Sequence, residues 1–291
     1  MELLFLVLLI LLIYYYYLLI KNNKKEHFVD KIIKKNDNND INNTSYNDLS
    51  KDYKIKVIYK KNTNYGDIII GKNKEYGKCL IIDKEIQLCD KQENIYHEMM
   101  VHFPMKYLSH DPEYVLIIGG GDLMTLREVM KYKSIKKVIM LELNKDVVNI
   151  CKNYFNVDDF SNNKKVEIIY GDANKTIDKL KLNFDLIISD TTEDNSTNLK
   201  IDKKHFFYRC YALLKKDGIL VKNGNYFQNY FSDIFDDNTI NYSFYLSYFQ
   251  DYYYFTLTGK KDIKNSKLRN YNIDYTYYNT NDHYKYVTFE M

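Results

Sequence analysis

The feature that most constrains this chain is a regular alternation of apolar and amphipathic segments between residues 112 and 223. The apolar runs have the character of strands that are buried on both faces, and the segments between them have the spacing of surface helices. Such an alternation predicts a doubly wound α/β domain with a parallel sheet. The apolar runs are YVLIIGGG, KVIMLELN, KVEIIYGD, FDLIISD and GILVKN.

Residues 53–111 have a different pattern. Short β-rich runs are separated by turns that contain Gly, Lys or Asn, and this spacing predicts a small antiparallel sheet. We therefore divide the body of the protein into an N-terminal β-strand domain, 53–111, and a larger domain, 112–291, whose Tyr- and Phe-rich end supplies further strands. The β-rich runs are KIKVIY, GDIIIG, GKCLIID and EIQLC.

Residues 3–20 form an unbroken run of Leu, Ile, Val, Phe and Tyr, long enough as a helix to cross a hydrocarbon core of roughly 30 Å. A cleaved signal peptide is the alternative, but Glu2 stands where such a peptide carries positive charge. Three lysines follow the run, so the positive-inside rule predicts a single-pass membrane protein with the body of the chain in the cytoplasm. We interpret residues 1–20 as a transmembrane anchor and the polar residues 21–52 as a flexible tether.

Charge and cysteine content narrow the classes of function. Lys and Arg number 42 against 39 Asp and Glu, and the resulting net charge of +3 gives no broad positive field for nucleic acid. The 4 cysteines lack the CxxC and Cys/His spacings of a zinc site. We therefore predict no nucleic-acid partner, no metal, no disulfide framework and a reducing compartment.

Glycine and acidic residues stand at the carboxyl ends of successive predicted strands. In an open α/β sheet these ends meet at one edge, where ligands bind. Glycine lets a ligand approach the backbone, and a carboxylate about 20 residues further on accepts hydrogen bonds from the two hydroxyls of a ribose. The residues are Gly119, Gly120, Gly121 and Asp122 after the first strand, Glu142 in the second, Gly171 and Asp172 after the third, and Asp190 at the end of the fourth.

Together these residues predict a nucleoside-bearing cofactor that carries positive charge. A pyrophosphate is disfavoured because Asp122 lies where it would approach, and like charges repel. Each position by itself is also explained by turn geometry or by an Asp that caps the next helix. The combination of acids at successive strand ends is what favours a site.

Several motifs, in this order along the chain, resemble the polyamine aminopropyltransferases, the spermidine synthase family. The resemblance covers about residues 53–289 and implies an N-terminal β-strand domain followed by a Rossmann-like domain of the S-adenosylmethionine-dependent transferase type. Here that fold is preceded by the predicted transmembrane helix. The motifs are GKCLIIDKEIQL, NIYHEMMVHFPM, VLIIGGGDLMTLREVMKY, KKVIMLELNKDVV, IIYGDANKTI, FDLIISDTTED and YYNTNDHYKYVTF.

The resemblance implies that an aminopropyl group moves from the co-substrate decarboxylated S-adenosylmethionine to putrescine or a related polyamine, releasing methylthioadenosine. Asp190 matches the family's proton acceptor. An acceptor is needed because an alkyl ammonium with a pKa of about 10.4 has no lone pair to offer at neutral pH. Family members commonly pair, so the resemblance also implies a homodimer.

The resemblance assigns binding residues as well. Asp122 is expected to repel the carboxylate that S-adenosylmethionine carries and that its decarboxylated form lacks. The donor side comprises Gly119, Gly120 and Gly121, Glu142 at the ribose, Asp172 and Ala173 at the adenine, and Thr197 at the position of a gate proline. The amine side comprises Tyr96, His97, Asp122, Glu193, Asn223 and Tyr248.

Some positions depart from the family pattern. Leu123 and Met124 follow the GGGD motif where the family has glycine, Glu193 replaces a second Asp in the gate, and Asn223 replaces a glutamine. These changes leave two alternatives beside aminopropyl transfer. One is a methyltransferase that depends on S-adenosylmethionine, and the other is a catalytically inactive, membrane-tethered binding module.

Overall fold

The computed structural model describes residues 55–83, 85–191, 203–224, 234–235, 238–249 and 251–288. The chain divides into two compact units, Met1–Cys89 and Asp90–Met291. The predicted domain boundary after residue 111 puts the segment NIYHEMMVHFPM in the N-terminal β-strand domain. In the structure this segment is part of helix α2, which lies in the second unit. The predicted tether, 21–52, and the predicted gate residues Glu193 and Thr197 lie outside the described residues.

The first unit contains a small antiparallel sheet, as the β-rich runs predict. Each strand pairs with the next along the chain because the connections between them are short turns. The turn before the second strand uses Gly66 at a φ of 109°, a conformation that glycine adopts at little cost. The strands are β1 (Ile55–Thr63), β2 (Gly66–Asn73), β3 (Gly77–Ile82) and β4 (Glu85–Cys89).

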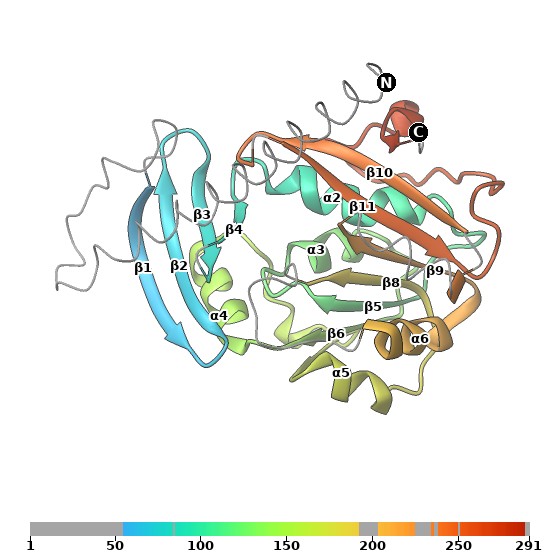
Figure 1. The fold of residues 1–291 in the computed structure, drawn as a ribbon, viewed down its shortest axis with the longest axis horizontal. Helices are drawn as coiled ribbons and strands as arrows, with labels where there is room; N and C mark the ends of the chain where they lie inside the picture. The colour runs from blue at the N-terminus through green and yellow to red at the C-terminus, as the bar shows by residue number, and fades with distance from the viewer. Residues whose placement is uncertain are drawn as a thin grey trace, which may run out of the picture. The chain divides into compact units, whose positions relative to one another are not determined.

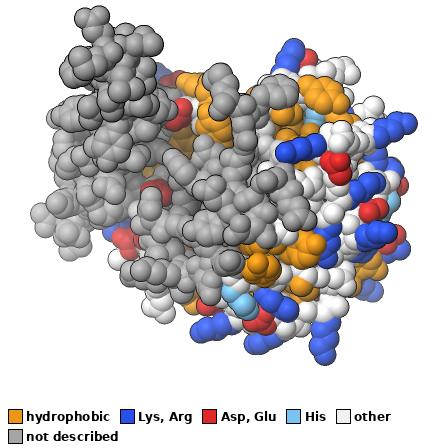
Figure 2. Space-filling model, turned by 45° about the vertical axis from the view of Figure 1, so that its right-hand side comes forward, with side chains coloured by type: hydrophobic (Ala, Val, Ile, Leu, Met, Phe, Trp, Pro, Cys, Tyr) orange, Lys and Arg blue, Asp and Glu red, His pale blue; other side chains and the backbone are white. Residues whose placement is uncertain are grey.

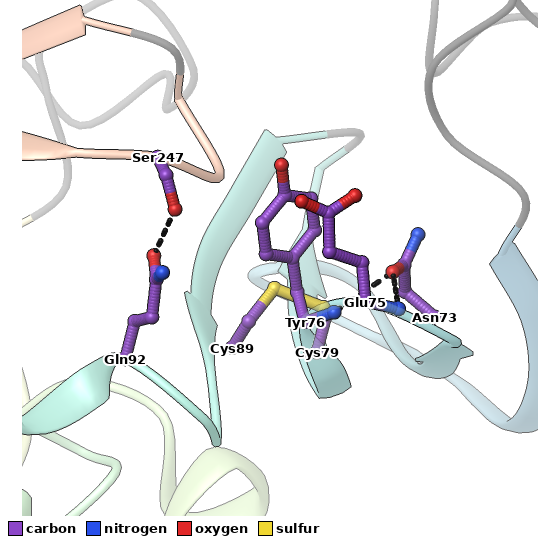
Figure 3. The surroundings of a disulfide bond; sticks show 7 residues. All are labelled: Asn73, Glu75, Tyr76, Cys79, Cys89, Gln92 and Ser247. Carbon is purple, nitrogen blue, oxygen red and sulfur yellow. Dashed lines mark hydrogen bonds between the residues drawn. A yellow bond between two sulfur atoms is a disulfide. The ribbon is translucent and has the colours of Figure 1, made fainter.

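Cys79 and Cys89 form a disulfide between β3 and β4, so the prediction of a chain without a disulfide was wrong. The two residues are direct partners in the antiparallel register, which brings their side chains together (Figure 3). The turn into β3 is held by the Asn73 side chain, whose oxygen accepts hydrogen bonds from the backbone of Glu75 and Tyr76 at 2.7 and 2.9 Å. The pairing was missed because it depends on hairpin register and carries no spacing motif.

Removing this disulfide should destabilise the protein. It closes a loop between cysteines separated by 10 positions, and such a loop is worth about 2–3 kcal/mol in the chain-entropy model. We expect the variant Cys79→Ala/Cys89→Ala to lose about that much free energy of unfolding in denaturant titrations without reductant. Dithiothreitol should weaken the wild type to a similar extent and leave the variant unchanged. Equal stability of the wild type with and without reductant would contradict a stabilising disulfide.

The second unit is built on one mixed sheet with the strand order β12-β10-β11-β9-β8-β5-β6-β7. The central strands pair in parallel, as the alternation of segments predicts, and β10, β11 and β12 extend the sheet in antiparallel fashion. The strands are β5 (Tyr114–Gly119), β6 (Lys137–Glu142), β7 (Val166–Tyr170), β8 (Phe184–Asp190), β9 (Leu214–Asn223), β10 (Thr239–Leu246), β11 (Asp251–Gly259) and β12 (Val287–Thr288).

Helices cover the sheet of the second unit on both faces. Alternate strand residues such as Leu116 and Ile187 pack with Phe206 and Cys210 of α6 in one buried cluster. Figure 1 shows α5 and α6 on this side and α2 with α3 on the other. The elements are α2 (Glu93–Met105), α3 (Met124–Met130), α4 (Lys145–Tyr154), α5 (Ala173–Thr176) and α6 (Lys203–Leu213), with 3-10 turns η1 (Phe160–Asn162), η2 (Ile177–Lys179) and η3 (Thr280–Lys285).

Charged side chains of both signs are distributed over the surface. Figure 2 shows Lys and Arg side chains dispersed over the described part of the visible face, with Asp and Glu side chains close to several of them. Some form surface ion pairs, such as Lys136 with Glu113 at 2.6 Å and Lys137 with Glu167 at 2.7 Å. This mixture is in keeping with a net charge of +3.

The predicted single-pass membrane localisation requires correction. Among the helices in the described part of the chain, none combines the length and the apolar character that crossing a bilayer requires. The run at residues 1–20, on which the prediction rested, lies outside the described residues. The prediction rested on the hydropathy of this run and on the charges that flank it, and no helix in the described ranges bears it out.

Candidate active site

The turn after β5 packs against the carboxyl ends of β8 and β6, the strands on either side of β5. Gly119 and Gly120 have φ values of 83° and 73°, and the Gly120 amide donates a hydrogen bond to the backbone oxygen of Asp190 at 3.1 Å. A Cβ on Gly119 would lie 2.0 Å from that oxygen, and one on Gly121 would lie 2.9 Å from Oε2 of Glu142. The glycines are therefore required for this close packing as well as for any approach of a ligand.

Asp190 is fixed by hydrogen bonds to both of its carboxylate oxygens. Oδ1 accepts from the Tyr96 hydroxyl at 2.8 Å, and Oδ2 accepts from the Thr125 hydroxyl at 2.7 Å. Burial and the neighbouring charge of Asp122 raise the pKa of Asp190, while His97 and the two hydroxyls act to lower it. A carboxylate with a raised pKa and a fixed orientation is suited to accept a proton.

Tyr96 presents its hydroxyl to Asp190 as a neutral donor. The side chain is buried and lies edge-on to Tyr253 and Phe255 at centroid distances of 5.4 and 5.1 Å. Burial, together with the nearby charge of Asp190, raises the pKa of the phenol well above its ordinary value. Tyr96 therefore keeps its proton and its hydrogen bond to Asp190 across the physiological pH range.

His97 lies between two carboxylates and is almost fully buried. Its Nδ1 is 2.9 Å from Oε2 of Glu93, and its Nε2 is 3.5 Å from Oδ1 of Asp122. Burial acts to lower the pKa of His97, but Asp122 and Glu93 outweigh burial and raise it well above the ordinary value. Asp122 is itself held by the Met124 amide, which donates to Oδ1 at 2.7 Å.

Glu142 is buried at the end of β6, next to the glycine turn. One of its oxygens accepts a hydrogen bond from the Asn144 amide at 2.7 Å. Burial, followed by the charges of Asp122 and Asp190, raises the pKa of Glu142 to about 7, although backbone hydrogen bonds oppose the rise. The Asn144 side chain in turn accepts from the Asp146 amide at 3.0 Å and caps α4, which holds this corner in place.

These side chains leave a position suited to a positively charged group. One ligand atom each from His97, Asp122 and Asp190 lie within 4.8 Å of one another. Carboxylates at this separation can hold a protonated amine or a metal ion. The expectation that no metal binds here stays a prediction.

The remaining predicted residues occupy separate places around this edge. Asp172 caps α5, its Oδ1 accepting from the Asn174 amide at 2.9 Å, and Ala173 begins that helix. Asn223, at the end of β9, donates through its side chain to the backbone oxygen of Thr191 at 2.7 Å. Tyr248 is buried after β10, and burial raises its pKa well above the ordinary value. The ligand roles of these residues stay predictions.

Three residues of the cluster were not singled out from the sequence: Glu93, Thr125 and Arg127. Glu93 precedes His97 by one helical turn, so the two face the same side of α2, and this spacing was the available signal. Thr125 and Arg127 reach the cluster from α3. Their contacts depend on how α3 packs against α2, which no local pattern predicts.

A glycine turn, a buried glutamate and fixed carboxylates at the ends of parallel strands are typical of a Rossmann-like domain. Comparisons with known proteins give the family. A spermine/spermidine synthase domain matches residues 93–265, and a spermidine synthase tetramerisation domain matches residues 41–90. The polyamine aminopropyltransferase of Buchnera aphidicola subsp. Acyrthosiphon pisum (strain Tuc7) is 32% identical over 249 residues, which cover 78% of this chain and 86% of that protein.

Solved structures agree with this match. A spermidine synthase in complex with the transition state analogue AdoDATO has a TM-score of 0.74 and 28% identity, covering 82% of this chain and 87% of that one. The spermidine synthase from Thermotoga maritima has a TM-score of 0.72 and 26% identity, covering 82% and 86%. The chain belongs to the spermine/spermidine synthase family of aminopropyltransferases.

The raised pKa of Glu142 predicts how stability depends on pH. The folded protein holds this proton up to about pH 7, whereas an unfolded glutamate releases it near the ordinary value of 4.5. Ionisation therefore costs stability as the pH rises through this window. Between about pH 4 and 8 we expect the wild type to lose about 3 kcal/mol of unfolding free energy relative to Glu142→Gln. Denaturant titrations of both proteins measure this difference, and a difference that is independent of pH would contradict it.

Proposed function

We propose that this aminopropyltransferase transfers the aminopropyl group of decarboxylated S-adenosylmethionine to putrescine or a related amine and releases methylthioadenosine. The observation that carries the proposal is the fixed, partly buried Asp190 beside Asp122 at the end of the central strands. The membership of the family supplies the reaction class. The assignments of individual residues below are part of the proposal.

We assign the role of proton acceptor to Asp190. The nucleophile is an amine nitrogen, which has a lone pair only after its ammonium has lost a proton. Asp190 accepts that proton and orients the nitrogen toward the carbon next to the sulfonium. The new C–N bond forms as the C–S bond breaks, and the electron pair of that bond stays on sulfur. The departing thioether is neutral, so no acid is needed to protonate it.

Glu142 and Asp122 are assigned to the donor. Ribose hydroxyls would donate to the buried carboxylate of Glu142 and replace the solvation that burial has removed. Asp122 would lie along the aminopropyl chain, where its charge favours the terminal ammonium and disfavours the carboxylate of S-adenosylmethionine. This discrimination separates aminopropyl transfer from the alternative of methyl transfer.

Substitution of Asp190 tests the proposal. We expect Asp190→Asn to lower kcat by about 10²- to 10⁴-fold, because the amide cannot accept the proton, while binding of methylthioadenosine changes less than threefold, on the order of 0.6 kcal/mol. The surface residue Asp159, paired with Lys152 at 2.5 Å, provides the control Asp159→Asn, which should leave kcat unchanged. The assay measures methylthioadenosine release with decarboxylated S-adenosylmethionine and a panel of amines.

Two results of this assay would overturn the proposal. Absence of turnover by a folded wild type across the panel would support the catalytically inactive alternative. Formation of S-adenosylhomocysteine from S-adenosylmethionine, faster than release of methylthioadenosine from the decarboxylated donor, would support a methyltransferase.

We also infer that the protein self-associates. The segment 41–90 matches a tetramerisation domain, and its described part forms the sheet β1-β2-β3-β4. Light scattering after size-exclusion chromatography should give a mass at least twice that of the 35.0 kDa chain. A monomer mass at micromolar concentration would contradict this inference.

A further inference from the structure

Glu93 and Arg127 form a bidentate ion pair next to His97. Nη1 and Nη2 of Arg127 donate to Oε1 and Oε2 of Glu93, each at 2.9 Å. The Nε of Arg127 donates to Oε1 of Glu128, also at 2.9 Å, so the guanidinium is held from two sides. Lysine has one charged nitrogen and cannot reproduce this planar arrangement of donors.

Glu93 connects this ion pair to His97. Its Oε2 lies 2.9 Å and its backbone oxygen 2.6 Å from Nδ1 of His97, and both atoms can only accept a hydrogen bond. Nδ1 must therefore carry a proton.

The other nitrogen of His97 also faces an acceptor. Nε2 is 3.5 Å from Oδ1 of Asp122, and the His97 side chain is only 1% exposed. A neutral imidazole carries one proton and would direct a lone pair at one of the two carboxylates. Both sides are satisfied when the ring is an imidazolium. The geometry thus favours an imidazolium among the acids of the site, with Asp122 as its ion-pair partner at 3.5 Å.

This positive charge acts on Asp122 and Asp190. Ligand atoms of the two carboxylates and of His97 lie within 4.8 Å of one another, and the charge of Asp122 by itself disfavours the ionised form of Asp190. An adjacent imidazolium offsets this repulsion and favours ionised Asp190. The proposed reaction needs Asp190 ionised before it can accept a proton.

We propose that Glu93, held in place by Arg127, is a positioning residue that keeps His97 doubly protonated and thereby keeps Asp190 ionised for proton acceptance. The consequence for Asp190 rests on the proposed function, whereas the charge state of His97 does not. Other titratable groups that face the cluster are Tyr96 of α2, Glu142 of β6, Tyr248 after β10 and Tyr253 of β11.

The first test measures the charge state of His97 by nitrogen NMR, with the signal assigned by its loss in His97→Gln. In the wild type both ring nitrogens should carry protons at pH 7.5. In Glu93→Gln the amide can still accept a hydrogen bond from Nδ1 but carries no charge, so the pKa of the ring should fall although Asp122 still faces Nε2. A neutral His97 in the wild type at pH 7.5, or an unchanged pKa of His97 in Glu93→Gln, would overturn the proposal. This measurement does not require turnover.

The second test measures the pH dependence of kcat/KM. In Glu93→Gln the acidic limb should move to higher pH by about one unit, which corresponds to a loss of about tenfold on the acidic side, with less than a twofold change on the plateau. Arg127→Lys should move the limb in the same direction. Glu113→Gln, which removes a surface carboxylate paired with Lys136, is the matched control and should leave the profile unchanged.

The two tests separate the possible failures. A uniform loss of kcat/KM at all pH values would indicate a structural role for Glu93 and would overturn positioning through charge. If the wild type shows no turnover with any amine, the proposed function fails. In that case the charge of His97 is still measured by nitrogen NMR. The titration of the Asp190 carboxyl carbon, compared between the wild type and Glu93→Gln, then decides whether that charge controls the ionisation of Asp190.

Discussion

The site depends on the close packing of the turn after β5 between two carboxylate-bearing strands. No Cβ fits at Gly119 against the backbone of Asp190, and little space remains at Gly121 beside Glu142. The turn therefore sets the separation of the acids as well as the space above the strand ends. Leu123 completes the turn at a φ of 69°, an uncommon conformation for a residue with a side chain, and its side chain is fully buried.

Bringing several carboxylates into a buried corner has an electrostatic cost. This cost is partly offset by hydroxyl groups that donate hydrogen bonds to Asp190 and by backbone amides that donate to Asp122 and Glu142. The positive side chain of His97 offsets it further. The cost that remains, first the loss of solvation and then the repulsion between the acids, raises the pKa of Asp190 and Glu142. A cationic substrate would relieve this remaining repulsion, so the same charges that destabilise the empty site favour the ligand that we propose.

The sequence predicted some elements of the fold and missed others. The buried strands and the helices between them were recognised from β5 to β9 because their apolar pattern is local. The disulfide between Cys79 and Cys89 was missed because it depends on the register of two strands. Hydropathy suggested a membrane span at residues 1–20, but no helix in the described ranges fits that role.

The candidate site shows the same division. Residue order alone indicated the acids Asp122, Glu142 and Asp190 at strand ends, since parallel strands bring their carboxyl ends to one edge whatever the details of packing. Tyr96 and His97 of α2 were assigned to the amine side through the family resemblance alone, and the tertiary structure shows the contacts that they make with these acids. Only the tertiary structure decided that Arg127 of α3 holds Glu93. Which helix face meets a strand end depends on side-chain packing between segments far apart in the chain, and local sequence does not encode that contact.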